Sequence, residues 1–117
     1  MSADSELPRG FSLSSGYQGP TSQLQVLIAA VPFVSHVITE VDVTIAGGST
    51  SVEQDYTVAI NGQVYGLVHT DGGVGTQTWT WTGSLTAPVD SLAAALVNNL
   101  NLQVGDHGFM TVTGYDI

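Results

Sequence analysis

An Asn61-Gly62 pair between two alternating apolar segments is the feature that most constrains the fold of this chain. Both residues of a two-residue type I′ turn need a positive φ, which Asn-Gly adopts at low cost, so we predict a β-hairpin over residues 55–69. The pairs that this register predicts on one face are Ile60–Gln63, Val58–Tyr65 and Tyr56–Leu67, and those on the other are Ala59–Val64 and Asp55–Val68. The first face is the better candidate for the core.

Further strands are predicted on both sides of this hairpin. Residues 36–45 alternate between apolar and polar side chains, apart from Ile38, as a strand with one buried face does. The other predicted strands cover residues 23–31, 76–83 and 109–115. Residues 88–99 favour a short helix or a turn, with Asp90 or Ser91 as cap and Asn98-Asn99 interrupting the pattern. About seven or eight short strands separated by turns indicate a single-domain, all-β antiparallel sandwich or barrel.

Residues 1–22 differ in composition from the rest, because they are rich in Ser, Gly and Pro. Such a segment is typical of an extended N-terminal arm, and residues 23–117 would then be the β-sandwich domain. Arg9, Phe11 and Tyr17 are the candidate interface residues of this arm. We expect the arm to lie on a neighbouring subunit, and packing on its own sandwich is the alternative.

The charge of the chain excludes several classes of partner. It has no lysine, Arg9 as its single arginine and ten acidic residues, for a formal net charge of −9. Nucleic-acid binding needs Lys and Arg to neutralise phosphates, so we expect neither nucleic acid nor an anionic membrane as a partner. No run of 18 apolar residues and no secretory signal is present, so we expect a product made in the cytoplasm. The absence of cysteine excludes disulfides and thiolate metal sites.

Four segments follow one another along the chain in a recognisable order. They are Val31-Pro32-Phe33, the strand at 37–45, the Tyr-Thr-Val-Ala-Ile-Asn-Gly hairpin at 56–62, and the Leu-Gln-Val-Gly-Asp turn at 102–106. This order resembles the jelly-roll modules of tailed-phage structural proteins, which include capsid decoration (cement) proteins and fibre or baseplate modules. Its closing half is also similar to the jelly rolls of trimeric C1q/TNF-like heads. Such modules continue past the turn with a further strand, which here would come from the N-terminal arm or from another subunit.

The resemblance implies a virion structural protein on the capsid exterior. Its partners would be the major capsid protein or other virion subunits, and it would be a homo-oligomer, commonly a trimer. The implied fold is jelly-roll-like, and no catalytic residue carries over, since the matching positions belong to turns and core.

Metal sites have weak support from the sequence. His36, His69 and His107 lack the paired spacing of zinc sites, and each falls at a predicted strand end. Asp71 in a Gly-rich loop, or Asp106 after Gly105, could join backbone carbonyls around calcium, although Asp and Gly are ordinary turn residues. We therefore expect no cofactor and no metal.

Enzymatic chemistry is also poorly supported. The chain has no cysteine, no G-x-S-x-G motif and no lysine, so the common nucleophiles and Schiff-base formers are missing. Glu40 and Asp42 share a strand face, where paired carboxylates for glycoside hydrolysis compete with the simpler explanation of an exposed acidic face. We therefore expect a non-enzymatic protein.

Trp79 and Trp81 alternate with threonines on one predicted strand. Aromatic rings on the surface of a β-sandwich can stack on sugars, whereas buried rings supply much of a small core, and the core is the favoured interpretation. The main functional hypothesis is thus a capsid decoration protein. The alternative is a glycan- or receptor-binding module of a phage tail fibre or baseplate, with Trp79 and Trp81 as stacking residues.

Overall fold

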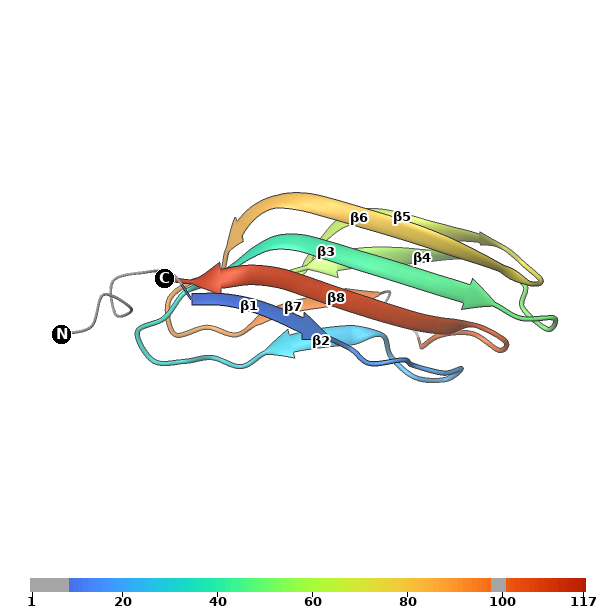
Figure 1. Ribbon diagram of the computed structural model, residues 1–117, viewed down its shortest axis with the longest axis horizontal. Helices are drawn as coiled ribbons and strands as arrows, with labels where there is room; N and C mark the ends of the chain where they lie inside the picture. Colours follow the sequence, from blue (N-terminus) through green and yellow to red (C-terminus); the bar gives the residue numbers. More distant parts are fainter. Residues whose placement is uncertain (1–8, 98–100) are drawn as a thin grey trace.

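The computed structural model describes residues 9–97 and 101–117 of the chain. These residues form eight strands (Figure 1): β1 (Arg9–Ser14), β2 (Gln25–Ile28), β3 (His36–Gly47), β4 (Glu53–Ile60), β5 (Gln63–Asp71), β6 (Gly75–Thr86), β7 (Ala93–Val97) and β8 (His107–Asp116). No helix among them has the length and hydropathy that crossing a bilayer requires.

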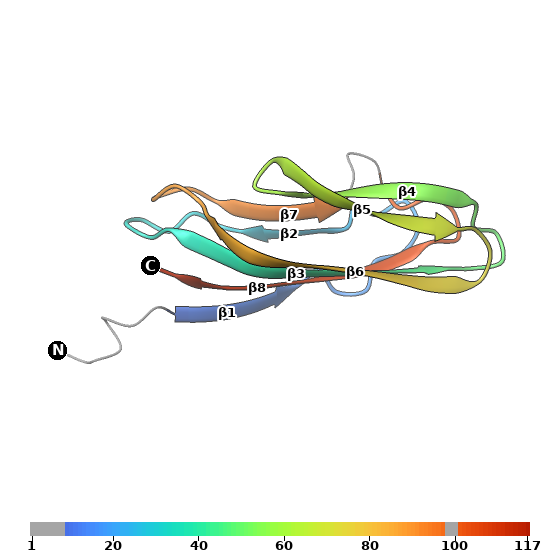
Figure 2. The same cartoon turned by 90° about the horizontal axis from the view of Figure 1, so that it is seen from above.

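The strands form two four-stranded antiparallel sheets that pack face to face, as Figure 2 shows from above. Sheet I has the order β1-β8-β3-β6, and sheet II has the order β2-β7-β4-β5. Successive strands alternate between the sheets, apart from the β4–β5 hairpin, which is the arrangement of an eight-stranded jelly roll with two Greek keys. The expected jelly-roll-like antiparallel sandwich is confirmed.

The N-terminal segment is placed differently from the extended arm that its composition predicts. Residues 9–14 form edge strand β1, which pairs with β8 from Arg9↔Asp116 to Ser14↔Thr111. The segment after β1 is also attached, because Gln18 forms a bridge with Gly108. Residues 9–22 are therefore part of the sandwich and complete sheet I within this chain, while residues 1–8 of the predicted arm lie outside the described residues.

The core lies between the sheets and consists almost entirely of aliphatic side chains. Its buried members are Leu24, Val26, Ile28, Ile38, Val41, Val43, Ile45, Tyr56, Val58, Ile60, Val68, Ala87, Ala93, Ala95, Val97, Leu102, Met110 and Val112. Strand β3 has an irregularity between Ile38 and Glu40. This bulge resets the alternation, so that Ile38, the exception in the sequence pattern, joins Val41 in the core.

The predicted Asn61-Gly62 turn is confirmed, since both residues have a left-handed φ, of 49° and 86°. The pairs next to the turn, Ile60↔Gln63 and Ala59↔Val64, also agree with the prediction. A bulge then places Gly66 opposite Val58, with Tyr65 as the extra residue. The three outer pairs predicted at Val58, Tyr56 and Asp55 are therefore wrong by one position, because the sequence pattern does not reveal the bulge.

The helix considered for residues 88–99 does not form in the described part of that segment. Residues 93–97 instead make strand β7, between β2 and β4. Ala93, Ala95 and Val97 are buried on one face, so packing between the sheets overrides the helical propensity of alanine. A turn precedes the strand, with Asp90 at a left-handed φ of 65°. The Asn98-Asn99 pair lies outside the described residues.

Candidate functional site

Trp79 and Trp81 point into the sandwich. They pair with Val43 and Val41 of β3, which are buried on the inner face of sheet I, and cross-strand partners share a face. Both indoles are partly buried and pack against the core. The Trp81 ring lies 5.5 Å from the Tyr65 ring at an angle of 54°. These rings close the side of the sandwich between edge strands β5 and β6, and they are not arranged as an open platform for a ligand.

Close packing also holds Trp79 in this position. The indole lies directly over Gly66 of β5, where a Cβ would come within 2.6 Å of its Nε1 atom. Gly66 is the residue that the bulge sets opposite Val58. Glycine at this position thus leaves room for the indole between the two sheets.

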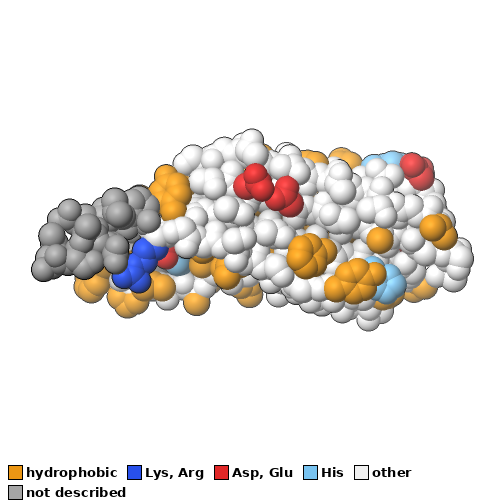
Figure 3. All heavy atoms as spheres, in the orientation of Figure 1, with side chains coloured by type: hydrophobic (Ala, Val, Ile, Leu, Met, Phe, Trp, Pro, Cys, Tyr) orange, Lys and Arg blue, Asp and Glu red, His pale blue; other side chains and the backbone are white. Residues whose placement is uncertain are grey.

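Two of the three candidate arm residues lie on β1. Phe11 packs against the core and makes an edge-to-face contact with His36, at 6.3 Å between ring centroids. Arg9 is exposed at the start of β1, at the same end of the sandwich as the C-terminus, where a basic side chain is visible in Figure 3. Phe11 therefore anchors the edge strand to its own sandwich.

Tyr17, the third candidate, is the most open aromatic ring on the outer face of sheet I. It is 70% exposed and stacks on His107, with 5.2 Å between the centroids and 15° between the planes. The bridge between Gln18 and Gly108 sets Tyr17 beside Phe109, which is 39% exposed on the same face. Figure 3 shows hydrophobic side chains beside a histidine on this face. Since His107 covers one side of the Tyr17 ring, the other side is available to a ligand.

The rest of this outer face carries hydroxyl and carboxyl groups in rows. Its threonines, on β3, β6 and β8, are Thr44, Thr78, Thr80, Thr82, Thr111 and Thr113. Glu40 and Asp42 lie among them, and an acidic pair is visible in the middle of Figure 3. The Thr80 hydroxyl donates a 2.7 Å hydrogen bond to Asp42. A hydrogen bond with Asp42, and then its charge, raise the pKa of Glu40.

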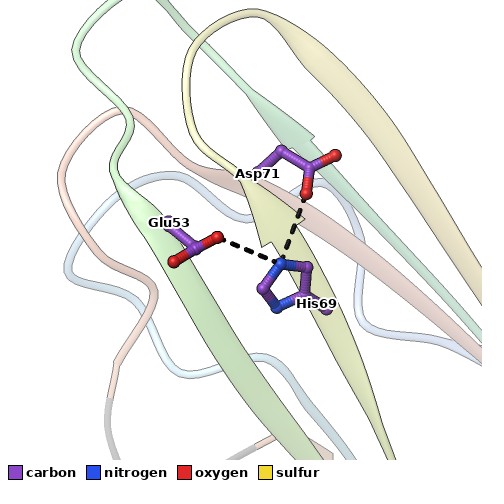
Figure 4. A group of neighbouring side chains, drawn as sticks. All are labelled: Glu53, His69 and Asp71. Atoms are coloured by element: carbon purple, nitrogen blue, oxygen red, sulfur yellow. Dashed lines mark ion pairs between the residues drawn. The ribbon is translucent and has the colours of Figure 1, made fainter.

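A second polar group lies on the outer face of sheet II, at the open end of the β4–β5 hairpin (Figure 4). His69 Nε2 is 3.4 Å from Glu53 and 3.3 Å from Asp71, while its Nδ1 is 2.6 Å from Asp55. The hydrogen bond with Asp55, and then the charges of the three carboxylates, raise the pKa of His69. All four side chains are exposed, and one ligand atom from each of Glu53, His69 and Asp71 could reach a common ion.

The sequence did not reveal this group because of the bulge in β5. Without the extra residue, Asp55 would pair with Val68 and His69 would face inward. With it, Asp55 pairs with His69 and Glu53 with Asp71 on the outer face.

The other two histidines do not belong to this group and make different contacts. His107 lies under Tyr17. His36 is only 2% exposed, and its ring nitrogens lie 2.6 Å from Asp116 and 2.7 Å from the carbonyl oxygen of Ala29. Burial lowers the pKa of His36, but these two hydrogen bonds more than offset it, so the pKa is raised. The structure does not bring the three histidines together as a zinc site among the described residues.

No protein-family model matches the sequence, and no curated protein matches it. Among solved structures, the fold is similar to the C-terminal domain of EclA, described as a sugar-binding protein, with a TM-score of 0.50 and 12% identity over 91% of this chain and 78% of that chain. A GH26-CBM35 β-(1,4)-mannanase from Podospora anserina gives a TM-score of 0.43 and 13% identity over 92% of this chain and 27% of that chain. The insecticidal delta-endotoxin Cry8Ea1 from Bacillus thuringiensis gives a TM-score of 0.35 and 13% identity over 92% of this chain and 19% of that chain. The chain thus shares its β-sandwich fold with a sugar-binding domain.

Proposed function

We propose that this chain is a non-catalytic glycan-binding module, which binds neutral oligosaccharides on the outer face of sheet I. The observation that carries the proposal is the open ring of Tyr17, held by His107 at the edge of a face rich in hydroxyl and carboxyl groups. The likeness in fold to a sugar-binding domain supports it. This is the alternative hypothesis of the sequence analysis, with the stacking role moved from Trp79 and Trp81 to Tyr17.

The chemistry of this face suits a sugar. A pyranose has an apolar side of C–H groups that packs on an aromatic ring, and Tyr17 offers such a ring with its hydroxyl as a polar end. The hydroxyl groups of the sugar both donate and accept hydrogen bonds, as the threonine hydroxyls do, and the carboxylates of Glu40 and Asp42 accept them. The ring and the polar rows lie along one face, so one oligosaccharide could contact both.

The negative charge of the chain favours neutral glycans over anionic ones. With a net charge of −9 and Arg9 as its only arginine, the surface repels sialylated, sulfated or phosphorylated chains. Arg9 is also at the far end of β1 from the Tyr17 ring. Neutral glycans are therefore the expected ligands.

An array of neutral and anionic oligosaccharides, followed by calorimetry on the strongest ligand, tests the proposal. Tyr17→Ala should weaken binding by about tenfold or more, because the stacking surface is lost. Tyr17→Phe keeps the ring and should retain most of the affinity. Phe33→Ala, at the opposite end of the sandwich, is the matched control and should bind like the parent. The proposal fails if no neutral glycan binds, or if Tyr17→Ala binds as tightly as the parent.

A second candidate is docking to a virion, as the resemblance to tailed-phage modules implies. The observation that favours it is an apolar end of the sandwich, beside the C-terminus in Figure 1. Its exposed side chains are Val31, Phe33, Val89, Leu92 and Ile117. Phe33 is 89% exposed, and exposed patches of this kind mark contact sites. A tail fibre or baseplate module would dock at this end, against further copies of itself or other virion subunits, and leave the glycan face free.

The loops of this apolar end are held in place, which suits a docking surface. Phe33 and Asp90 both have a left-handed φ, of 63° and 65°. The Phe33 N–H donates a 2.5 Å hydrogen bond to the Asp90 carboxylate, and the Asp90 N–H donates to the carbonyl of Val34. Two more backbone hydrogen bonds join Ser35 and Ile117. These contacts offset the strain that presents the Phe33 ring to solvent.

Light scattering with size-exclusion chromatography tests the docking candidate. The parent should form a homo-oligomer such as a trimer at high concentration, and Phe33→Ser should shift it toward the monomer. A parent that stays monomeric at every concentration would contradict self-association through this end.

A further inference from the structure

A small cavity of about 60 Å³ lies at the end of the sandwich opposite the C-terminus. The loop at 47–51, the loop at 71–75 and Asp106 surround it, and Thr70 and Gln77 complete its wall. The two loops approach closely, since a Cβ on Gly47 would collide with the carbonyl oxygen of Gly73. The Gly73 N–H also donates to the Ser51 carbonyl at 2.9 Å. The cavity can hold an ion with a few water molecules.

Asp106 is the unusual member of this wall, because its carboxyl group is 0% exposed. The Tyr56 hydroxyl donates to Oδ2, and the Gln103 N–H donates to the Tyr56 oxygen at 2.9 Å, so both side chains are fixed. Burial, and then this hydrogen bond, raise the pKa of Tyr56, which therefore remains a proton donor. The other oxygen, Oδ1, has no hydrogen-bond partner among residues 9–97 and 101–117.

A buried carboxylate oxygen without a partner requires compensation. None of the described residues that line the cavity is a lysine, an arginine or a histidine, so no side chain there provides positive charge. The available ligands are oxygen atoms, from the side chains of Asp106, Ser51, Thr70 and Gln77 and from the peptide carbonyls of the loops. Several oxygens in flexible glycine-rich loops match the coordination of calcium, whereas magnesium demands a more rigid octahedral shell.

We propose that this cavity is a calcium site, in which Asp106 Oδ1 is the central anionic ligand and neutral oxygen atoms of the surrounding residues complete the shell. The site joins three separate parts of the chain, namely the loop after β3, the loop after β5 and the turn before β8. It is independent of the glycan face. It also differs from the exposed group in Figure 4, because the carboxylates of that group, Asp71 included, contact His69 on the outer face of sheet II.

The experiment compares the chelator-treated full-length protein with and without added calcium, and measures the melting temperature Tm. Calcium at about one hundred times its dissociation constant should raise Tm by about 10 °C, and magnesium should have a much smaller effect. Asp106→Asn should abolish the shift, and Gln77→Leu, which removes a neutral oxygen ligand, should reduce it. Glu53 belongs only to the exposed group, so Glu53→Gln is the matched control and should keep the full shift in Tm.

Terbium luminescence gives a second measurement that does not depend on stability. Trp79 lies two residues from Gln77 on β6, so bound terbium should be sensitised by tryptophan and displaced by calcium. If Asp106→Asn does not fold, Gln77→Leu and the titration of the parent decide. The proposal is overturned if about 10 mM calcium produces neither a Tm shift nor terbium displacement, since the weakest protein calcium sites are filled there. It is also overturned if the shift survives in Asp106→Asn and disappears in Glu53→Gln.

Discussion

Replacing Trp81 by alanine separates a core role from a ligand-binding role. The indole is partly buried, packs against the core and contacts the ring of Tyr65. Complete removal of a buried tryptophan costs about 3–5 kcal/mol, and the partial exposure of Trp81 places the expected cost near the lower value, about 3 kcal/mol. A domain of this size is stable by about 5–15 kcal/mol, so Trp81→Ala should still fold.

The same loss can be expressed as a change in melting temperature. An unfolding entropy of about 2.1 cal/mol/K per residue gives about 0.25 kcal/mol/K for 117 residues. A loss of about 3 kcal/mol then lowers Tm by about 12 °C, which differential scanning calorimetry measures directly. Phe33→Ala removes an aromatic ring that contributes little to the core, and should change Tm by about 2 °C or less. A decrease under about 3 °C for Trp81→Ala, together with loss of glycan binding, would refute the assignment of this residue to the core.

Three further predictions concern a charge and two glycines. The pKa of His36 is raised above its usual 6.5, so its ion pair with Asp116 stabilises the fold fully below pH 6.5 and this contribution is lost as the pH rises through the raised value. Thermal unfolding between about pH 5.5 and 8.5 should show this decrease as a falling Tm. Asp116→Asn should make the dependence of Tm on pH weaker. A Tm that rises with pH would contradict the prediction. The Cβ added by Gly62→Ala meets no atom within 4 Å, but the alanine must adopt a φ of 86°. Denaturant unfolding should therefore show a loss of about 1–2 kcal/mol in the free energy of unfolding. An unchanged free energy would argue against the type I′ turn. Gly114→Ala should prevent soluble folding, as judged by circular dichroism, because its Cβ would collide with the backbone of Val37; a stable, folded variant would refute this packing.

The sequence predicted those features that depend on local chemistry. The Asn61-Gly62 turn needs only the φ preferences of its two residues, and both strands of the hairpin follow from alternation. The bulge at Tyr65 leaves no mark in the alternation of the sequence, so the grouping of His69 with three carboxylates could not be predicted. Strand β7 was missed for a similar reason, since its alanines favour a helix when considered alone.

Part of the candidate site could be predicted from the sequence alone. Tyr17 was identified as an interface residue because it is an aromatic side chain in a polar segment, and the structure adds the His107 ring beneath it. Asp71 and Asp106 were each considered as calcium ligands, and each alone is an ordinary turn residue. The structure places both in one cavity, which no local pattern could indicate, because β6 and β7 separate them in the chain.

The position of β8 in the middle of sheet I has a consequence for synthesis of the protein on the ribosome. This last strand pairs with β1 on one side and with β3 on the other, so neither can complete its hydrogen bonding until residues 107–116 have left the exit tunnel. Until then the nascent chain exposes two unpaired strand edges, which invite association with other chains. Folding of the sandwich therefore waits for β8 and should be slow, on the millisecond-to-second scale of proteins dominated by non-local strand pairing.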